Sequence, residues 1–266
     1  MVKLMKAILF DLDGVFYQGE KSIAGASYVA TWVKEQGIPH LFITNTSSRP
    51  RSALVDKLVG FDIFTDEAHI LTPPVAAIRW LKSQQNNGDV ALFVPEATKN
   101  EFKGLPLLTN NSSSNISAVV IGDLGEKWNF SLLNQAFRYL MSRPTPVFIT
   151  LGMTCYWQAE DGLRLDVAPF AIALEYASGI KPLVMGKPAK AFYQTALDSL
   201  QIEANETLMI GDDIRGDIEG AQQAGLYAAL VKTGKFRPED LEKNIKPDIV
   251  FDSIVDLPKW WEEKSN

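Results

Sequence analysis

The hydrophobic and polar positions of the chain alternate between short apolar runs and helical spacing. Ala7–Phe10 and residues 39–44 are short apolar runs bounded by polar residues, which is typical of buried strands. Residues 25–36 have apolar positions three and four apart and are followed by Gly37, which predicts a helix that ends at this glycine. A second helix is expected over residues 49–59. This alternation predicts parallel strands joined by right-handed crossovers.

The middle third of the chain carries a second series of elements, with enough of them to bury a small core of its own. The pattern predicts strands at 90–94, 116–121 and 146–149, helices at 75–84, 97–102, 131–141 and 168–178, a polar loop at 110–115 and a hairpin around 159–162. The first pattern then resumes, with helices at 190–200, 217–224 and 254–261 and strands at 207–210, 227–231 and 249–251. We therefore expect an α/β fold with a doubly wound, Rossmann-like parallel-sheet core (residues 1–73 and 184–266) and an inserted α/β domain (residues 74–183).

Composition narrows the classes of partner. The 266 residues have a formal net charge of -6 and a pI of about 5.1, which argues against nucleic acid and anionic membranes as partners. No apolar run is long enough to span a bilayer, so no membrane span is expected. Cys155 is the only cysteine, which excludes an intrachain disulfide and fits a reducing cytoplasm. The two histidines, His40 and His69, are too few and too far apart in sequence to predict a histidine metal site, and we expect them to be structural or solvated.

Two carboxylates directly follow the first predicted strand. Asp11 and Asp13 are two residues apart, so their side chains would point the same way at the C-terminal end of the strand, and Gly14 allows a sharp turn. Two like charges brought to one place are unfavourable unless a cation or a proton lies between them. The structural alternative is a strand that ends in an Asp-rich turn.

Three more predicted strands are followed by polar residues. These residues are Thr44 and Asn45, Lys187, and Asp212 and Asp213. Ligands bind beyond the carboxyl ends of the strands in open parallel sheets, so we expect the side chains to gather near Asp11 and Asp13. Each group also has a structural interpretation. Thr44 could cap a helix, Lys187 could lie in a solvated loop, and the aspartates of residues 212–217 could cap the helix that follows.

The order of these groups resembles the haloacid dehalogenase superfamily of phosphotransferases. The four motifs of that superfamily are matched by DLDGV at 11–15, Thr44 in ITNT, Lys187 in GKP, and GDDIRGD at 211–217. The inserted segment, between the second and third motifs, has the place and size of the larger α/β cap of the NagD-like subgroup. A narrower resemblance, to the phospholysine phosphohistidine inorganic pyrophosphate phosphatases, rests on residues 162–169, 173–177 and 233–238. Some animal members of that group have Ser where this chain has Asp13, so their substrate is not carried over.

The resemblance implies a Mg²⁺-dependent phosphatase that works through an aspartyl-phosphate. Asp11 would attack phosphorus, and Asp13 would give a proton to the leaving oxygen and then activate water. Mg²⁺ prefers oxygen ligands, and those implied are Asp11, Asp212 and the backbone carbonyl of Asp13. Asp213 is expected near or on the metal, and Asp217 just outside these ligands, where it would orient Lys187 or a metal-bound water.

Phosphate binding is the other function that the resemblance implies for the strand ends. Thr44 would hold a phosphoryl oxygen through its hydroxyl, while Lys187 would supply a fixed positive charge. Leu12, Asp13 and Asn45 are expected to contribute to the same site, in part through backbone N–H groups.

The expected substrate is a small phosphorylated compound or pyrophosphate, enclosed by the cap during the reaction. Two alternatives remain: a phosphotransferase on the same fold, and a non-catalytic binding or regulatory protein, against which the presence of both Asp11 and Asp13 argues. The resemblance also implies a homodimer formed through the cap. Tyr17, Ser47 and Arg49 are candidates to face the substrate. The turn at 166–169 is either an anion site or a plain helix start.

Overall fold

The computed structural model describes residues 4–84, 88–109, 115–159 and 161–265. The chain forms two compact units, which we call the core unit and the inserted unit. The core unit comprises Met1–Thr44, Arg51–Leu71 and Lys187–Asn266, and the inserted unit comprises Asn45–Pro50 and Thr72–Gly186. Within the described ranges, no helix has the length and apolar character needed to cross a membrane.

A six-stranded, entirely parallel sheet forms the middle of the core unit, in the order β14-β13-β12-β1-β4-β5. Its strands are β1 (Ala7–Phe10), β4 (His40–Ile43), β5 (Ile70–Leu71), β12 (Thr207–Gly211), β13 (Tyr227–Val231) and β14 (Ile249–Phe251). From β1 the chain proceeds to β4 and β5 on one side, whereas from β12 it proceeds to β13 and β14 on the other. The strand order therefore reverses between β1 and β12, where open α/β sheets place their ligands.

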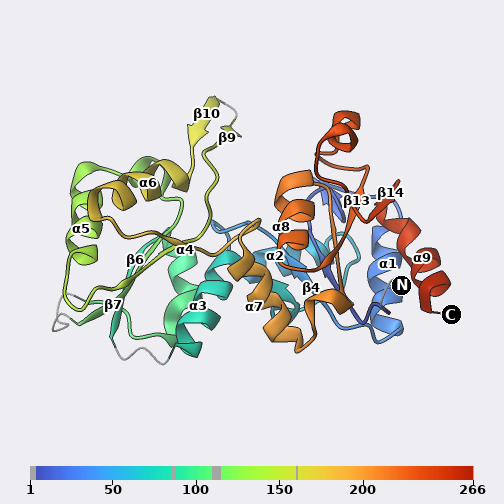
Figure 1. Cartoon of the computed structure of the whole chain (residues 1–266), viewed down its shortest axis with the longest axis horizontal. Helices are drawn as coiled ribbons and strands as arrows, with labels where there is room; N and C mark the ends of the chain where they lie inside the picture. Colours follow the sequence, from blue (N-terminus) through green and yellow to red (C-terminus); the bar gives the residue numbers. More distant parts are fainter. Residues whose placement is uncertain (1–3, 85–87, 110–114, 160, 266) are drawn as a thin grey trace. The chain divides into compact units, whose positions relative to one another are not determined.

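Helices cover both faces of this sheet (Figure 1). They are α1 (Ala26–Glu35), α2 (Arg51–Val59), α7 (Lys190–Leu200), α8 (Gly220–Gln223) and α9 (Leu257–Ser265). The first, α1, packs near α9, while α7 packs on α8. Ile8 and Phe10 of β1 share one apolar cluster with Val29 and Val33 of α1, as the two-residue period of a strand requires.

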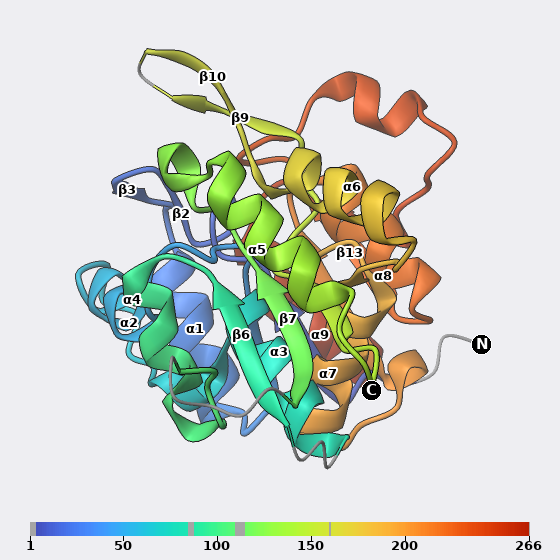
Figure 2. The same cartoon turned by 90° about the vertical axis from the view of Figure 1, so that its left-hand side faces the viewer.

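The inserted unit has its own sheet, in the order β11-β8-β7-β6, with every pair parallel. Its elements are α3 (Pro73–Ser83), β6 (Asp89–Phe93), α4 (Glu96–Lys99), β7 (Ile116–Ile121), α5 (Phe130–Leu140), β8 (Val147–Thr150), the antiparallel hairpin β9 (Tyr156–Ala159) and β10 (Gly162–Leu165), α6 (Val167–Ser178) and β11 (Leu183–Val184). Figure 2 shows α5 and α6 together over one face of the sheet, and Figure 1 shows α3 on the other. Apolar side chains of α5 and α6 join those of β6, β7 and β8 in a separate cluster. Val184, which the sequence-based division assigns to the core, pairs with Thr150 of this sheet.

The expected α/β fold is confirmed, and several of its elements differ from the prediction. A short hairpin of β2 (Tyr17–Gln18) and β3 (Lys21–Ser22) was not expected, nor was β5, because two-residue strands are too short to show a period. The helix expected over 217–224 is instead a π-helical turn, η5 (Ile214–Glu219), that runs into α8. Most of the polar segment 110–115 lies outside the described residues. Six short 3-10 turns complete the described elements: η1 (Glu67–His69), η2 (Asn100–Gly104), η3 (Gly125–Lys127), η4 (Ala204–Glu206), η6 (Pro238–Glu242) and η7 (Ile254–Asp256).

Candidate active site

The carboxyl ends of β1 and β12 bring two aspartates together. Phe10 pairs with Ile210 in the parallel register, and the N–H of Asp11 donates to the carbonyl of Ile210 at 2.9 Å. Asp11 therefore follows β1 directly beside the residues that lead to Asp212. Both aspartates are buried: Asp11 is 6% exposed and Asp212 is 1% exposed. The sheet register thus places two carboxylates at the switch point of the fold.

Lys187 joins these carboxylates from the segment that re-enters the core unit. Its Nζ lies 2.5 Å from Oδ1 of Asp11 and 2.7 Å from Oδ1 of Asp217, and its side chain is 5% exposed. Burial alone would lower the pKa of Lys187. The charges of Asp11 and Asp217 outweigh that effect and raise the pKa above its usual value. Lys187 is therefore a fixed cation rather than a solvated loop residue.

Three carboxylates surround this lysine, since Asp11, Asp212 and Asp217 offer oxygens that all lie within 4.8 Å of one another. Burial, and then the charge of Asp11, raises the pKa of Asp212 to about 6. When all four side chains are ionised, three negative charges and one positive charge leave two negative charges in excess. Oδ1 of Asp212 is buried and has no hydrogen-bond partner among the described residues. Both observations fit a divalent cation with oxygen ligands.

Asp217 owes its place to the π-helical turn η5. Its Oδ2 accepts the N–H of Asp213 at 3.1 Å, which ties the carboxylate back to the start of the turn. Burial, and then the charge of Asp11, raises its pKa. A side chain at Gly211 would overlap the Asp217 carboxylate, so glycine is required there. Asp217 was expected outside the metal ligands, near Lys187, and it is both paired with Lys187 and close to Asp11 and Asp212.

Asp213 and Asp13 are oriented differently from the buried group. Oδ1 of Asp213 accepts the N–H groups of Arg215 and Gly216 at 3.0 and 2.9 Å, so this side chain caps η5. Asp13 is exposed, and its backbone forms an isolated bridge with Tyr17. Asp13 therefore differs from the buried carboxylates in being open to solvent.

The expected phosphate-binding residues fall in both units. Thr44 is 6% exposed and follows β4, the strand next to β1, and its N–H donates to Leu71 at 3.1 Å. It does not cap α2, which begins at Arg51. The Leu12 side chain is fully buried in the apolar core. Asn45, with Ser47 and Arg49, belongs to the inserted unit.

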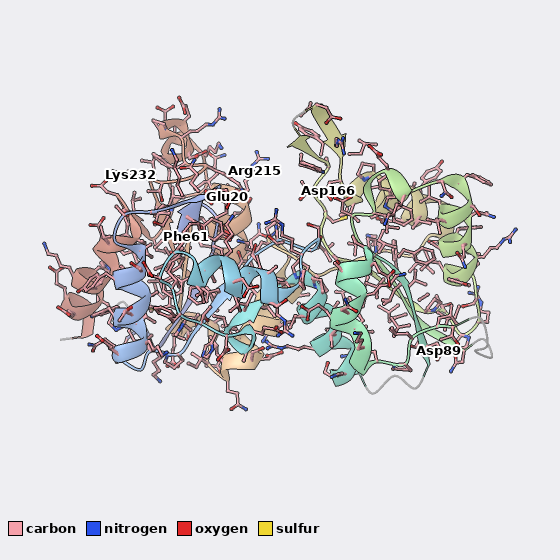
Figure 3. The ribbon with its side chains drawn as sticks, turned by 180° about the vertical axis from the view of Figure 1, so that it is seen from behind. Glu20, Phe61, Asp89, Asp166, Arg215 and Lys232 are labelled. Carbon is pink, nitrogen blue, oxygen red and sulfur yellow. The ribbon has the colours of Figure 1, made fainter. Side chains whose placement is uncertain are left out.

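Two other candidates have structural surroundings. Tyr17 is 6% exposed, its ring is tilted against that of Phe61 at 5.6 Å between centroids, and the ammonium of Lys57 lies 4.4 Å from its ring centroid. Asp166, labelled in Figure 3, caps α6, and its Oδ1 accepts the N–H of Val167 at 2.7 Å. The carboxylate therefore occupies that N-terminal N–H group, which favours the plain helix start over an anion site.

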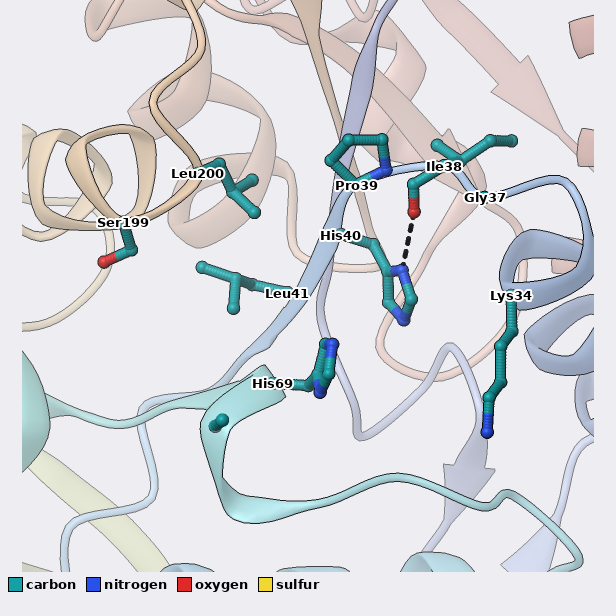
Figure 4. Close-up of a pocket in the computed structure, with 10 residues that line it drawn as sticks. Lys34, Gly37, Ile38, Pro39, His40, Leu41, His69, Ser199 and Leu200 are labelled. Carbon is teal, nitrogen blue, oxygen red and sulfur yellow. Dashed lines mark hydrogen bonds between the residues drawn. The ribbon is translucent and has the colours of Figure 1, made fainter.

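The two histidines are neighbours in the structure despite their distance in sequence. Their rings stack with centroids 5.3 Å apart, beside a pocket of about 390 Å³ (Figure 4). Nδ1 of His40 is 2.8 Å from the carbonyl of Ile38, and Nδ1 of His69 is 2.9 Å from Oδ1 of Asp66. The two rings meet because β5 pairs with β4, and each histidine stands at the amino end of one of these strands.

Tyr193 supports the site and was not singled out from the sequence. It lies in the first turn of α7, is fully buried, and its hydroxyl donates to the carbonyl of Gly216 at 2.8 Å, with that of Asp217 at 3.2 Å. In the sequence, Tyr193 occupies a helix position that is typical of an ordinary core residue. Only the proximity of α7 to η5 reveals that it steadies the turn that carries Asp217.

The chain is similar to proteins of one family over nearly its whole length. A model of haloacid dehalogenase-like hydrolases matches residues 8–107, and a model described as HAD-hydrolase-like matches residues 184–257. Phospholysine phosphohistidine inorganic pyrophosphate phosphatase of Homo sapiens is 38% identical over 258 residues, which cover 95% of this chain and 91% of that protein.

Solved structures agree with this likeness. A p-nitrophenyl phosphatase from Archaeoglobus fulgidus matches with a TM-score of 0.84 and 27% identity, over 96% of this chain and 99% of that chain. NagD from E. coli K-12 matches with a TM-score of 0.83 over 96% of this chain and 98% of that chain; at 21% identity it bears on the fold alone. The resemblance inferred from the four motifs is confirmed.

Proposed function

Because this chain belongs to the haloacid dehalogenase-like hydrolase family, we propose that it is a Mg²⁺-dependent phosphatase. The observation that carries the proposal is the buried group of Asp11, Asp212 and Asp217, whose charge a single lysine only partly balances. A doubly charged cation held by these carboxylates would offset the excess and so reduce the repulsion that a phosphorylated substrate meets. The names of similar proteins, which include two kinds of phosphatase, support the same reaction.

Asp11 is the proposed nucleophile. Its carboxylate attacks phosphorus, the bond from phosphorus to the leaving oxygen breaks, and an aspartyl-phosphate forms on Asp11. Lys187, 2.5 Å from Oδ1 of Asp11, holds the carboxylate in place for this attack. Water then attacks phosphorus, and the bond to Asp11 breaks, which releases phosphate and restores the carboxylate.

Asp13 is the proposed proton carrier for both halves of the reaction. It gives a proton to the leaving oxygen in the first step and takes one from the attacking water in the second. Its exposed side chain is able to exchange protons, whereas the buried carboxylates are held by ion pairs and hydrogen bonds.

The metal ligands that we propose are Asp11, Asp212 and the backbone carbonyl of Asp13. Mg²⁺ held there would neutralise charge on the phosphoryl oxygens. Asp213 caps the turn behind these ligands. The place of Asp217 supports a role in fixing Lys187, with which it is paired at 2.7 Å. Its proximity to Asp212 also makes it a further candidate ligand.

Phosphoryl oxygens would bind to the hydroxyl of Thr44, the ammonium of Lys187 and backbone N–H groups near Leu12, Asp13 and Asn45. The proposed substrate is a small phosphorylated compound or pyrophosphate, with the inserted unit setting specificity. An acceptor other than water would make the enzyme a phosphotransferase on the same residues. A non-catalytic role would leave the buried charge of the site unexplained.

The inserted unit is also the proposed homodimer surface. Large apolar side chains on its hairpin and helices are exposed, namely Phe130, Tyr156, Trp157, Leu163, Leu165, Ile172 and Tyr176. Exposed large apolar side chains on one unit support an interface there. Sedimentation at micromolar concentration should give a dimer for the wild type and a monomer for Leu163→Lys. Phe64→Lys, in the core unit and equally exposed at 67%, should stay dimeric. A wild-type monomer would exclude the dimer.

The proposed location is the cytoplasm, where a single cysteine would stay reduced. The acidic charge of the chain is in keeping with a small-molecule substrate rather than nucleic acid. Fractionation of cells that express the tagged chain would test the location.

Hydrolysis of a phosphate-ester panel tests the proposed reaction. The panel holds sugar phosphates, nucleotides, pyridoxal phosphate, pyrophosphate and phosphoramidates, each with and without Mg²⁺. We expect phosphate release that EDTA abolishes and Mg²⁺ restores, and a loss on the order of 10⁴-fold or more in Asp11→Asn. The exposed Asp198→Asn variant controls for the substitution and should keep full activity. Full activity in Asp11→Asn, or in EDTA, would refute the mechanism.

A further inference from the structure

The two carboxylate oxygens of Asp212 have different surroundings. Oδ2 accepts the backbone N–H of Lys235 at 2.6 Å. Oδ1 is buried and has no hydrogen-bond partner among the described residues. A carboxylate with one oxygen fixed and the other open presents a single, oriented ligand atom. The backbone of the loop after β13 therefore decides which way Asp212 faces.

That loop, Thr233–Lys235, also contacts the turn after β1. The hydroxyl of Thr233 donates to the carbonyl of Gly14 at 2.5 Å. Gly14 and Gly234 have φ values of +86° and +64°, which suit glycine, and a side chain at either would overlap the Asp212 carboxylate. A side chain at Gly234 would also overlap Cα of Gly14. The two glycines thus let two backbones and one carboxylate pack without space between them.

Gly14 is held from its other side as well. Its N–H donates to the carbonyl of Tyr17 at 2.6 Å. Because a trans peptide unit is planar, the carbonyl of Asp13 points opposite to that N–H. The hydrogen bond to Tyr17 therefore sets the direction of the Asp13 carbonyl, and the bond from Thr233 prevents Gly14 from turning.

We propose that Thr233–Lys235 is a positioning loop that sets two metal-ligating groups, Oδ1 of Asp212 and the carbonyl of Asp13, before the metal binds. This inference rests on the proposed function, because it assumes the Mg²⁺ site described there. Groups that hydrogen-bond to metal ligands commonly contribute 10- to 100-fold to metal affinity. Thr233 and the Lys235 N–H are positioning groups: the N–H bonds the Asp212 carboxylate directly, and the Thr233 hydroxyl bonds the carbonyl of Gly14, the residue after Asp13.

The side chain and the backbone N–H of Lys235 reach different carboxylates, which makes the loop testable. Its ammonium lies 3.5 Å from Oδ2 of Asp213 and is largely exposed, while its N–H reaches Asp212. Lys235→Ala removes the ammonium and keeps the N–H. Lys235→Pro removes both. At Thr233, Val removes the hydroxyl at nearly constant shape, and Ser keeps it.

Calorimetric titration of Mg²⁺ alone into EDTA-stripped protein tests the proposal without any need for activity. We expect Thr233→Val and Lys235→Pro to weaken Mg²⁺ binding about 10-fold or more. Thr233→Ser and Lys235→Ala should stay within about threefold of the wild type, because both variants keep the hydrogen bonds that position the ligands. Urea unfolding in EDTA shows which variants are folded. If Lys235→Pro is unfolded, the comparison of Thr233→Val with Thr233→Ser tests the proposal.

The outcomes separate this proposal from the function on which it rests. Wild-type affinity in both Thr233→Val and folded Lys235→Pro, with binding lost in Asp212→Asn, would overturn the positioning loop and leave the Mg²⁺ site standing. Equal weakening in Thr233→Val and Thr233→Ser would also overturn it, since the hydroxyl would not be responsible. Absence of Mg²⁺ binding by the wild type would overturn both.

Discussion

The two ends of the core sheet hold titratable side chains in opposite surroundings. At the carboxyl ends, Asp11, Asp212 and Lys187 are buried, and Oδ1 of Asp212 lacks a hydrogen-bond partner among the described residues. At the amino ends, His40 and His69 stack beside an open pocket of about 390 Å³, and Nδ1 of each has a polar atom of the chain within hydrogen-bonding distance.

The comparison shows that a large pocket is not by itself evidence of a functional site. The amino-end pocket is large, but Nδ1 of each imidazole already has a polar partner within the chain. When its four side chains are ionised, the carboxyl end carries two surplus negative charges in a buried place, and a protein tolerates such an arrangement where a ligand will offset it. Unbalanced charge is therefore the better guide to function in this fold.

The largest effect is expected from Lys187→Met, which leaves three buried carboxylates without their cation. Loss of one partner of a buried pair typically costs about 3–5 kcal/mol. We expect a fall of that size in the free energy of unfolding at pH 8, measured with urea in EDTA. The deficit should shrink toward pH 5, because Lys187 lowers the pKa of Asp217 and its removal favours the neutral acid.

Lys34→Met is the matched change at the amino end. Lys34 is exposed on the rim of the histidine pocket, and surface substitutions usually stay within about 0.5 kcal/mol. Equal destabilisation by the two methionine variants would mean that the carboxyl end is no more strained than the surface.

Metal addition should stabilise the carboxyl end alone. At a free Mg²⁺ concentration 100 times the dissociation constant, the gain for a site present only in the folded state is about 2.7 kcal/mol. Thermal melts with and without Mg²⁺ should show an upward shift for the wild type and for Asp198→Asn. Asp212→Asn removes the carboxylate whose Oδ1 has no hydrogen-bond partner among the described residues, so this variant should lose most of the shift. A full shift in Asp212→Asn would place Mg²⁺ elsewhere.

Much of this arrangement could be predicted from the sequence, because its long elements have a clear period. β7 and α7 lie at the residues expected, and the order of the four motifs anticipated that Asp11 and Lys187 meet across 176 residues of chain. The catalytic roles of these residues stay predictions. The position of the Asp217 carboxylate could not be predicted, because the π-helical turn η5 follows no simple apolar period. The histidine pair was missed because β5 has two residues and leaves no pattern.

A smaller effect is expected from Tyr193→Phe, which removes the hydroxyl that supports η5. Its bonds to the carbonyls of Gly216 and Asp217 are buried, so the loss should be about 1–2 kcal/mol in urea unfolding. Tyr28→Phe, at a site that is 61% exposed, should change stability by less than about 0.5 kcal/mol. Similar values for the two variants would mean that the hydroxyl of Tyr193 does not steady the turn.

The smallest effect is expected at the amino end, in the pH dependence of stability. Burial lowers the pKa of His40 below 6.5, and the nearby His69 and Lys34 add to this against the opposing bond to Ile38. The folded protein then binds fewer protons than the unfolded chain in the window just below pH 6.5. Stability from neutral His40 is therefore complete above that pH and is lost as the pH falls through the window. Urea unfolding between pH 7.5 and 5.5 should give a shallower decline in His40→Gln than in the wild type, and an equal or steeper decline would show that His40 titrates as it does in the unfolded chain.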